Sequence, residues 1–353
     1  MENSLREKGL VLLGPIAPPQ WGPAVRNRIM LDTFENWGIK VVVLNTLAWK
    51  SRPLGFLIDV VKNVWHIPRV ILGVSSRGRF VLIPLLVLLK VLKNVKIILY
   101  PAGGLFCQEI QALPSVFKWL YMEMLRRLDL ICVERPELAD QFQSLGVCRP
   151  MILPNFKITP KIIQKKEETE IVQLLFLSRI RAVKGVESLL KAADILVGKG
   201  YKIQIDFYGI IQPDYEKEFF DLLDKRPFCK YQGVLEYSNV IPAIASYDIM
   251  IFPTMVTTEG FPGVLADAAI AGLPVIASDV PSNREIVDDG FNGKLFRPGD
   301  AVDLADKLES LIVNKAARLE MGKNNRFKGN AYDVEVVLGD FVKKLTELGW
   351  GKE

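Results

Sequence analysis

Glu259-Gly260-Phe261-Pro262-Gly263-Val264-Leu265-Ala266-Asp267 joins two short apolar runs, residues 247–253 and 272–277, that are typical of buried strands. The segment Val264–Ala271 has a helical pattern, so Glu259 stands just before a helix and Asp267 stands inside it. The first turn of a helix offers unpaired N–H groups and the positive end of the helix dipole. Two carboxylates beside such a turn indicate a ligand that carries both phosphates and hydroxyls.

Length and composition predict a soluble globular chain with two domains. The 353 residues are 50% apolar and 24% charged, and the longest apolar run, Phe80–Leu89, is too short to span a bilayer. The first residues lack the apolar segment of a signal peptide. The four cysteines form no Cys-x-x-Cys pair, which argues against a disulfide framework or a metal site and favours the cytoplasm.

The charge is distributed unevenly. Residues 1–155 hold 19 Lys and Arg against 11 Asp and Glu, whereas the rest of the chain holds 26 against 29. This asymmetry predicts an anionic partner for the first half, either a membrane surface or a phosphorylated acceptor, with a merely solvated basic face as the alternative. No basic stripe interleaved with aromatic residues is present, so we expect no nucleic-acid partner.

Short β-branched runs alternate with amphipathic stretches in both halves, as in parallel sheets covered by helices. We expect an α/β protein with two Rossmann-like domains, residues 1–155 and 156–330, whose sheets face a cleft, and a terminal helix within 331–353 that packs back toward the first domain. The predicted strands are 10–14, 40–44, 95–100, 128–133, 151–153, 172–177, 202–208, 229–233, 249–252, 274–277 and 294–296. In such folds, ligands bind at the carboxyl ends of the strands.

Two cations follow the predicted strand 172–177. Arg179 and Lys184 lie on one loop between that strand and the next helix, where they can hold the same anion. Arg contributes a planar fork of donors and Lys a point charge, a combination that suits a diphosphate. The spacing alone is weak evidence for such a site, since two surface cations on a loop are common. The element at Glu259 strengthens this evidence.

These elements together resemble the retaining glycosyltransferases of the GT-B fold, specifically the large family four of group 1 enzymes. The resemblance rests on Ser178-Arg179 through Lys184-Gly185, on Glu259 to Asp267, and on three later matches. The later matches are Gly272-Leu273-Pro274-Val275-Ile276-Ala277-Ser278-Asp279, Glu285-Ile286-Val287 and Asp289-Gly290-Phe291-Asn292-Gly293. The resemblance is close from about residue 150 to 315 and loose before that.

The resemblance implies a role for each matching residue. Arg179 and Lys184 would bind the donor diphosphate and stabilise the charge that develops on it, and Glu259 would orient the donor sugar. Asp267 falls where relatives have a Glu that holds the ribose hydroxyls. The other implied donor contacts are Gly260, Phe261, Pro262, Gly263, Val264 and Leu265 around the helix start, with Gly209 and Val234 near the base.

The sequence departs from the family pattern at two positions. Asp267 is one methylene shorter than the usual Glu, and an Asp that only caps or solvates the helix is the alternative. Ala102 stands where many relatives have a His, although Gly103 and Gly104 of the same turn are kept and fit a close approach of backbone to ligand. Gly22, in a proline-rich loop, matches part of a Gly-Gly loop that borders donor and acceptor in relatives.

Only one histidine is present, His66, which is interpreted as a surface or structural residue. A Ser-His-Asp triad and a multi-histidine zinc site are therefore excluded, and no convincing Asp-x-Asp occurs. We expect no metal and no cofactor, with the cations taking the part that magnesium plays elsewhere.

Two segments combine apolar and basic residues, Arg77–Lys96 and Ser115–Arg127. Either one suits a basic amphipathic helix lying on an anionic membrane, and a core helix with solvated ends is the alternative.

The expected activity is transfer of a hexose-type sugar, with retention, from a UDP- or GDP-sugar to a glycan or lipid-linked acceptor. Cell-envelope polysaccharide assembly, in the cytoplasm or at the inner face of the membrane, is the expected setting. The alternatives are a non-catalytic protein that binds a sugar nucleotide or glycan, and a nucleotide-sugar epimerase on the same scaffold.

Overall fold

The computed structural model describes residues 8–18, 22–74, 76–101, 103–147, 150–163 and 170–350. The chain divides into two compact units. The first unit comprises residues 1–157, 258–261 and 334–353, and the second comprises residues 158–257 and 262–333. The chain therefore leaves the first unit, builds the second, and returns to the first at its end.

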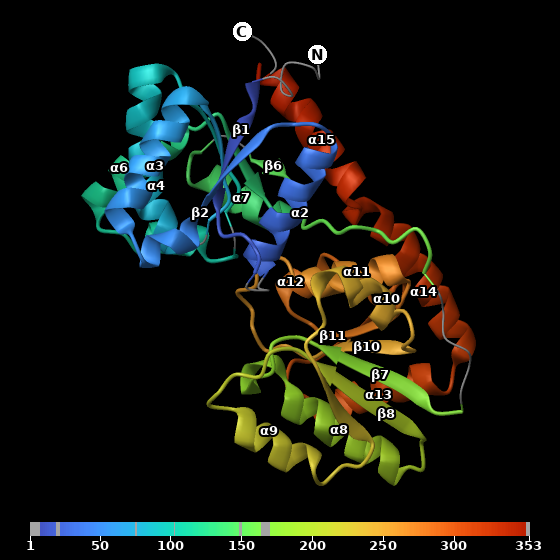
Figure 1. Cartoon of the computed structure of the whole chain (residues 1–353). Helices are drawn as coiled ribbons and strands as arrows, with labels where there is room; N and C mark the ends of the chain where they lie inside the picture. Colours follow the sequence, from blue (N-terminus) through green and yellow to red (C-terminus); the bar gives the residue numbers. More distant parts are fainter. Residues whose placement is uncertain are drawn as a thin grey trace. The chain divides into compact units, whose positions relative to one another are not determined.

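The first unit is built on a parallel sheet, which has six strands within the described residues (Figure 1). The strand order is β2-β1-β3-β4-β5-β6. The strands are β1 Leu10–Gly14, β2 Val41–Asn45, β3 Arg69–Leu72, β4 Lys96–Leu99, β5 Leu130–Val133 and β6 Met151–Ile152. Strands β1 and β5 are buried throughout, which explains why they consist of apolar runs rather than alternating ones, and β3 is buried as well although it begins with Arg69.

Helices cover both faces of this sheet. They are α2 Gly22–Asn36, α3 Pro53–His66, α4 Ser76–Lys93, α5 Phe106–Gln111, α6 Ser115–Arg126, α7 Pro136–Ser144 and α15 Val334–Glu347, with a 3₁₀ turn at Thr46–Lys50. On one face, side chains such as Val60 of α3, Leu86 of α4 and Leu125 of α6 pack against Val11, Leu72 and Ile97 of the strands. The three helices α3, α4 and α6 thus form one layer on one face of the sheet.

The second unit repeats this architecture with the order β12-β11-β10-β7-β8-β9, again parallel in the part of the chain that the structure describes. The strands are β7 Val172–Leu177, β8 Ile203–Tyr208, β9 Cys229–Gly233, β10 Ile249–Phe252, β11 Val275–Ser278 and β12 Gly293–Phe296. The chain first builds outward from β7 through β8 to β9, and then returns to place β10 on the other side of β7. The strand order reverses between β7 and β10, which is where open parallel sheets bind their ligands.

The helices of the second unit also lie on both faces of its sheet. They are α8 Val186–Gly198, α9 Glu216–Leu223, α10 Val240–Ile244, α11 Gly263–Ala271, α12 Pro281–Arg284, α13 Ala301–Ile312 and α14 Lys315–Gly329, with 3₁₀ turns at Ala182–Lys184, Tyr237–Asn239 and Asn330–Tyr332. Helices α8, α9 and α13 share one apolar core with alternate side chains of β7, β8 and β10. Helix α11 is buried on nearly every side.

The sequence predicted most of these strands to within two residues, and β1, β7, β9 and β10 begin and end where predicted. One strand was missed. Strand β3 follows Pro68 directly and begins with Arg69, so its apolar run has only three residues and did not stand out. The run Val70-Ile71-Leu72 before Gly73 was the signal that could have revealed it.

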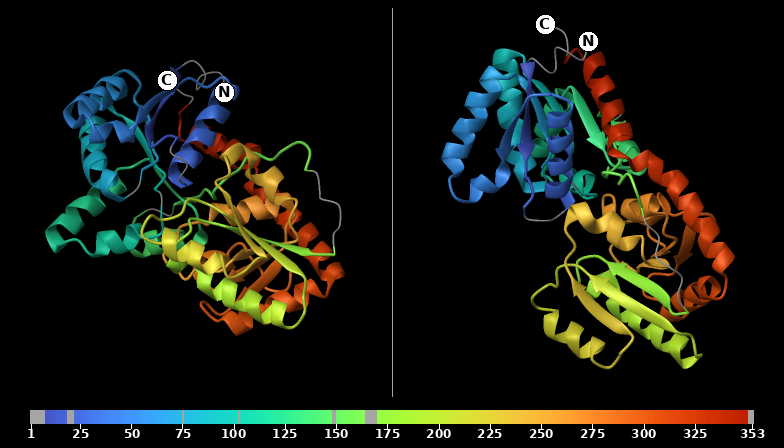
Figure 2. Two further views of the ribbon diagram at one scale, coloured as in Figure 1. Left: turned by 60° about the horizontal axis from the view of Figure 1, so that its bottom comes forward. Right: turned by 45° about the vertical axis from the view of Figure 1, so that its right-hand side comes forward.

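The last helix belongs to the first unit, where α15 lies beside α2 (Figure 2). Trp37 donates a hydrogen bond from its indole N–H to Glu335 at 3.1 Å, and Lys96 donates from Nζ to the carbonyls of Leu348 and Gly349 at 2.9 and 2.8 Å. The Trp350 side chain is fully buried. Among the described helices, none is long and apolar enough to cross a membrane.

Candidate functional site

Three cations lie on the loop that follows β7 in the second unit. Arg179 and Lys184 were predicted there, and Arg181 joins them. Arg179 is exposed, yet partial desolvation and the charge of Arg181 lower its pKa. Arg181 is half-buried, and its Nε has no hydrogen-bond partner in the described structure. The sequence analysis missed Arg181 because the family pattern names only the first and last cations of this loop.

Lys184 has an unusual environment for a lysine. It closes the 3₁₀ turn after β7, is only 4% exposed, and places Nζ 5.4 Å from the centre of the Phe252 ring. Burial, followed by the positive charges of Arg181 and Arg179, lowers the pKa of Lys184 to about 7. A bound anion would relieve both effects, since it would pair with the ammonium group and screen the three cations from one another.

Two glycines allow the loops at the strand ends to approach one another closely. Gly185, at φ +76°, begins α8, and a Cβ on it would lie 1.9 Å from the carbonyl oxygen of Pro253 after β10. Gly209, at φ +138°, follows β8, and its Cβ would lie 1.8 Å from the carbonyl oxygen of Ser178. Any side chain would therefore separate the loops after β7, β8 and β10. These contacts place the cationic loop directly at the switch point of the sheet.

Gly209 also connects to the next strand. Its N–H donates to the carbonyl of Gly233 at 2.9 Å, and its own carbonyl accepts from the Tyr231 hydroxyl at 3.0 Å. Val234 follows directly and is half exposed. The predicted contacts for a base, Gly209 and Val234, are thus neighbours at one edge of the sheet.

Helix α11 carries the predicted residues from Gly263 to Asp267. No side chain caps its N-terminus at Pro262, and the N–H of Leu265 donates to the Pro262 carbonyl at 2.9 Å. The N–H of Leu265 is therefore used within the first turn, which leaves Gly263 and Val264 as the first-turn donors for a ligand. Asp267 is only 4% exposed, so it does not solvate the helix, which was one part of the alternative interpretation.

Glu259, Gly260 and Phe261 are grouped with the first unit, next to the predicted glycine turn. A Cβ on Gly104 would lie 2.9 Å from the carbonyl oxygen of Thr258, and one on Gly260 would lie 3.2 Å from Gly103 Cα. The structure thus brings the two predicted glycine segments together. Ala102, the position of the missing histidine, lies outside the described residues. Gly22 begins α2 and is exposed, with open space where a Cβ would be.

A buried ion pair stands next to this glycine contact and was not predicted. Arg26 of α2 donates to Glu134 at 3.0 Å and to the Tyr100 carbonyl at 3.1 Å, and its guanidinium lies 3.7 Å from the centre of the Tyr100 ring. Burial raises the pKa of Glu134, although Arg26 opposes this. A Cβ on Gly260 would lie 2.5 Å from Glu134 Oε2. The sequence signal that could have revealed this pair was the position of Glu134, a charged residue directly after the buried strand β5.

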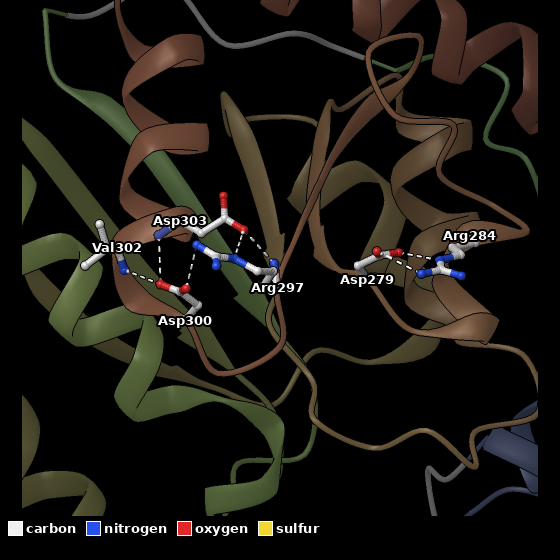
Figure 3. A network of polar contacts seen from close by, with 6 residues as sticks. All are labelled: Asp279, Arg284, Arg297, Asp300, Val302 and Asp303. Atoms are coloured by element: carbon white, nitrogen blue, oxygen red, sulfur yellow. Dashed lines mark hydrogen bonds and ion pairs between the residues drawn. The ribbon is translucent and has the colours of Figure 1, made fainter.

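The charges at the β11–β12 edge of the second unit are, in contrast, matched by partners (Figure 3). Arg284 pairs with Asp279, and Arg297 pairs with Asp300 at 2.9 Å and with Asp303. Asp300 also caps α13 by accepting from the N–H groups of Val302 and Asp303. These cations are already neutralised by neighbouring acids.

No acid among the described residues forms an ion pair with Arg179 or Arg181. This difference singles out the loop after β7, rather than the β11–β12 edge, as the place in the second unit that suits an anion.

Comparison with known sequences identifies similar proteins for the second half of the chain. The family model for glycosyl transferases group 1 matches residues 157–328. The capsular polysaccharide biosynthesis glycosyltransferase CapM of Staphylococcus aureus is 27% identical over 151 residues, which are 43% of this chain and 39% of CapM. Sulfoquinovosyl transferase SQD2 of Arabidopsis thaliana is 30% identical over 152 residues, 42% of this chain and 29% of SQD2. The chain spans less than half the length of these curated relatives.

Solved structures match over nearly the whole chain. HepE of Anabaena in complex with UDP aligns with a TM-score of 0.74 and 15% identity over 96% of this chain and 100% of HepE. Sucrose-phosphate synthase of Thermosynechococcus elongatus aligns with a TM-score of 0.75 and 15% identity, covering 96% and 99% of the two chains. The two parallel α/β units have the GT-B fold, as predicted.

The match of the family model over residues 157–328 confirms the predicted resemblance to the group 1 glycosyltransferases.

Proposed function

We propose that this protein is a metal-independent, retaining glycosyltransferase that moves a hexose-type sugar from a UDP- or GDP-sugar to a glycan or lipid-linked acceptor. The observation that carries the proposal is the cluster of Arg179, Arg181 and Lys184 at the switch point of a group 1 domain. Arg179 and Arg181 form no ion pair with an acid among the described residues, so both charges can attract an anion to this loop.

The donor diphosphate occupies this loop. Arg179 and Lys184 pair with its oxygens, and their attraction strengthens as the glycosidic bond breaks and negative charge moves onto the leaving diphosphate. The first-turn N–H groups of Gly263 and Val264 add to this field. The three cations supply the neutralisation for which other transferases use a divalent metal, so no cofactor is required.

The carboxylates and the remaining strand ends orient the rest of the donor. Asp267 holds the ribose hydroxyls, and its burial stabilises one orientation of the carboxylate. Gly209 and Val234 border the base, and Glu259 orients the donor sugar. Gly22, Gly103 and Gly104 border the acceptor, where small residues allow a glycan to approach the backbone.

The acceptor and setting follow from the relatives and from the charge of the chain. One relative is named as a capsular polysaccharide enzyme, and another, from Campylobacter jejuni, is named for a diphospho-undecaprenol acceptor. The excess of cations in residues 1–155 suits an acceptor attached to an anionic membrane rather than a nucleic acid. We therefore place the protein in the cytoplasm, at the inner face of the membrane, in cell-envelope polysaccharide assembly.

A thermal-shift panel with UDP, GDP, ADP and their common sugar conjugates, run with EDTA, tests the donor site. We expect UDP or GDP to stabilise the wild type clearly and to lose this effect in Arg179→Ala. Arg284→Ala is the matched control, because Arg284 is also a cation near a strand end but is paired with Asp279.

The stabilising nucleotide then selects the sugar conjugates for a transfer assay, in which NMR of the product reports the anomeric configuration. An inverted product would contradict retention. The absence of any nucleotide shift at millimolar concentration would contradict the donor site itself.

A further inference from the structure

The layer formed by α3, α4 and α6 in the first unit has two apolar sides. Figure 1 shows the three helices together, coloured blue to teal, and α4 contacts both α3 and α6. Their inner side chains build the core against the sheet. Their outer side chains point away from it, so the exposed sides of the three helices make up one outward surface.

This outward surface, the α3–α4–α6 face, carries many large apolar side chains. On α4, Val81, Leu88 and Leu92 are 42%, 57% and 63% exposed, and their spacing of seven and four residues places them on one side of the helix. The further exposed apolar residues are Leu54, Ile58 and Trp65 of α3, Val91 of α4, and Val116, Phe117, Trp119 and Leu120 of α6. Soluble monomers rarely collect so many in one place, and such a surface marks an interaction site.

The same helices are cationic. Together they contain seven Lys and Arg and two Asp and Glu. Two of the cations do not contribute free charge to the face, because Arg79 is buried and paired with Glu109 and Lys90 is paired with Asp129. Both acids are already paired with arginine, Asp59 with Arg52 at 2.8 Å and Glu123 with Arg126 at 3.5 Å. The exposed cations Lys62 and Lys93 remain beside the apolar side chains, which favours a partner that is both apolar and anionic.

Two tryptophans lie on this surface, one of them beside a lysine. Nζ of Lys93 lies 4.8 Å from the centre of the Trp65 ring and also donates to the Trp65 carbonyl, which joins the ends of α4 and α3. Trp119 of α6 is 65% exposed. Tryptophan and lysine are favoured at the boundary between lipid headgroups and acyl chains, because each has an apolar body and a polar end.

We propose that the α3–α4–α6 face docks onto an anionic lipid bilayer, with the apolar side chains below the headgroups and the lysines and arginines among them. A second copy of the chain fits this surface less well. A symmetric dimer would bring two cationic faces together, which costs free energy. The proposal deepens the membrane setting of the proposed function by naming the surface that makes the contact.

Vesicle flotation at low salt tests this assignment. We expect the wild type to float with phosphatidylcholine vesicles that contain phosphatidylglycerol, and to do so about 10-fold less with phosphatidylcholine alone or in 0.5 M NaCl. The double variant Phe117→Ser/Trp119→Ser should lower the partition coefficient at least ~10-fold, since two large side chains no longer enter the lipid. Leu88→Gln on the neighbouring helix should lower it in the same direction.

Phe327→Ser is the matched control, because Phe327 is 76% exposed on α14 of the second unit and should leave flotation unchanged. Each variant should keep the nucleotide-induced thermal shift of the wild type, which separates a failure of docking from a failure of the donor site. No flotation of the wild type, or equal loss in Phe327→Ser, would overturn the proposal. So would a concentration-dependent dimer that Phe117→Ser/Trp119→Ser abolishes, because the face would then be an interface between copies.

Discussion

At the scale of single residues, Lys184 gives the proposed site a pH dependence. Its pKa of about 7 means that the free protein loses this charge as the pH rises from 7 to 9. A bound diphosphate favours the charged form, so binding takes up a proton above pH 7. We expect the affinity for UDP or GDP, whichever binds, to fall by up to ~10-fold per pH unit between pH 7 and 9, measured by calorimetry.

Lys184→Gln is the reference for this measurement. It should bind more weakly at pH 7 and show a flat pH profile over the same range, since the titrating group is gone. The phosphate groups of the nucleotide are shared by both proteins and cancel in the comparison. Equal slopes in wild type and Lys184→Gln would show that Lys184 does not contact the diphosphate.

Glu259 should affect the reaction more than donor binding. In the proposed mechanism it orients the sugar, whereas the diphosphate supplies most of the binding energy through the cationic loop. We expect Glu259→Ala to lower the transfer rate by at least ~10²-fold, the scale of losing one stabilising partner of a transition state, with nucleotide affinity little changed. Steady-state kinetics and nucleotide binding on the same preparation check this. A rate near that of the wild type would remove Glu259 from the mechanism.

At the scale of loops and strands, the proposed site requires glycine at position 185. Gly185→Ala combines a left-handed backbone at φ +76° with a Cβ 1.9 Å from the Pro253 carbonyl oxygen. We expect it to destabilise the protein by more than ~1 kcal/mol and to weaken nucleotide binding, because the loops after β7 and β10 must separate.

Gly198→Ala is the matched control for this substitution. Gly198 lies in α8, the helix that Gly185 precedes, and has open space where a Cβ would be. Alanine there should leave stability unchanged or raise it slightly, since it favours the helix. Thermal unfolding and nucleotide titration of the two variants measure the difference. Equal behaviour would mean that the close contact at Gly185 is not required.

The same elements show how far the sequence could predict this structure. Strands β7 and β10 were predicted with the observed bounds because both are dominated by apolar residues, with Gln173 the one polar residue of β7. Arg179 and Lys184 were predicted to lie together because a single loop carries both. The Arg26–Glu134 pair could not be predicted, since 108 residues separate its members and only the order of the strands brings them together. Arg181 was missed because a motif names positions and not the charges between them.

At the scale of the whole molecule, the return of the chain to the first unit makes its last helix part of that unit's core. Phe341 of α15 is fully buried, as are Leu338 and Leu345 on the same helix. All six tryptophans of the sequence fall within the first unit, so tryptophan fluorescence reports the unfolding of that unit. A defect in α15 can therefore be observed separately from the nucleotide site, whose cationic loop belongs to the second unit.

Phe341→Ala should lower the stability of the first unit by ~3–5 kcal/mol, the usual range for removing a buried aromatic ring. The measurement is urea unfolding followed by tryptophan fluorescence, in which the transition should move to lower urea. Val336→Ala is the control, because Val336 is 51% exposed on the same helix and should change the stability by less than ~0.5 kcal/mol. Below its transition, Phe341→Ala should still bind the nucleotide with wild-type affinity, since the cationic loop lies in the second unit. An unchanged fluorescence transition would show that α15 does not stabilise the first unit, and a loss of nucleotide affinity would show that folding of the second unit depends on it.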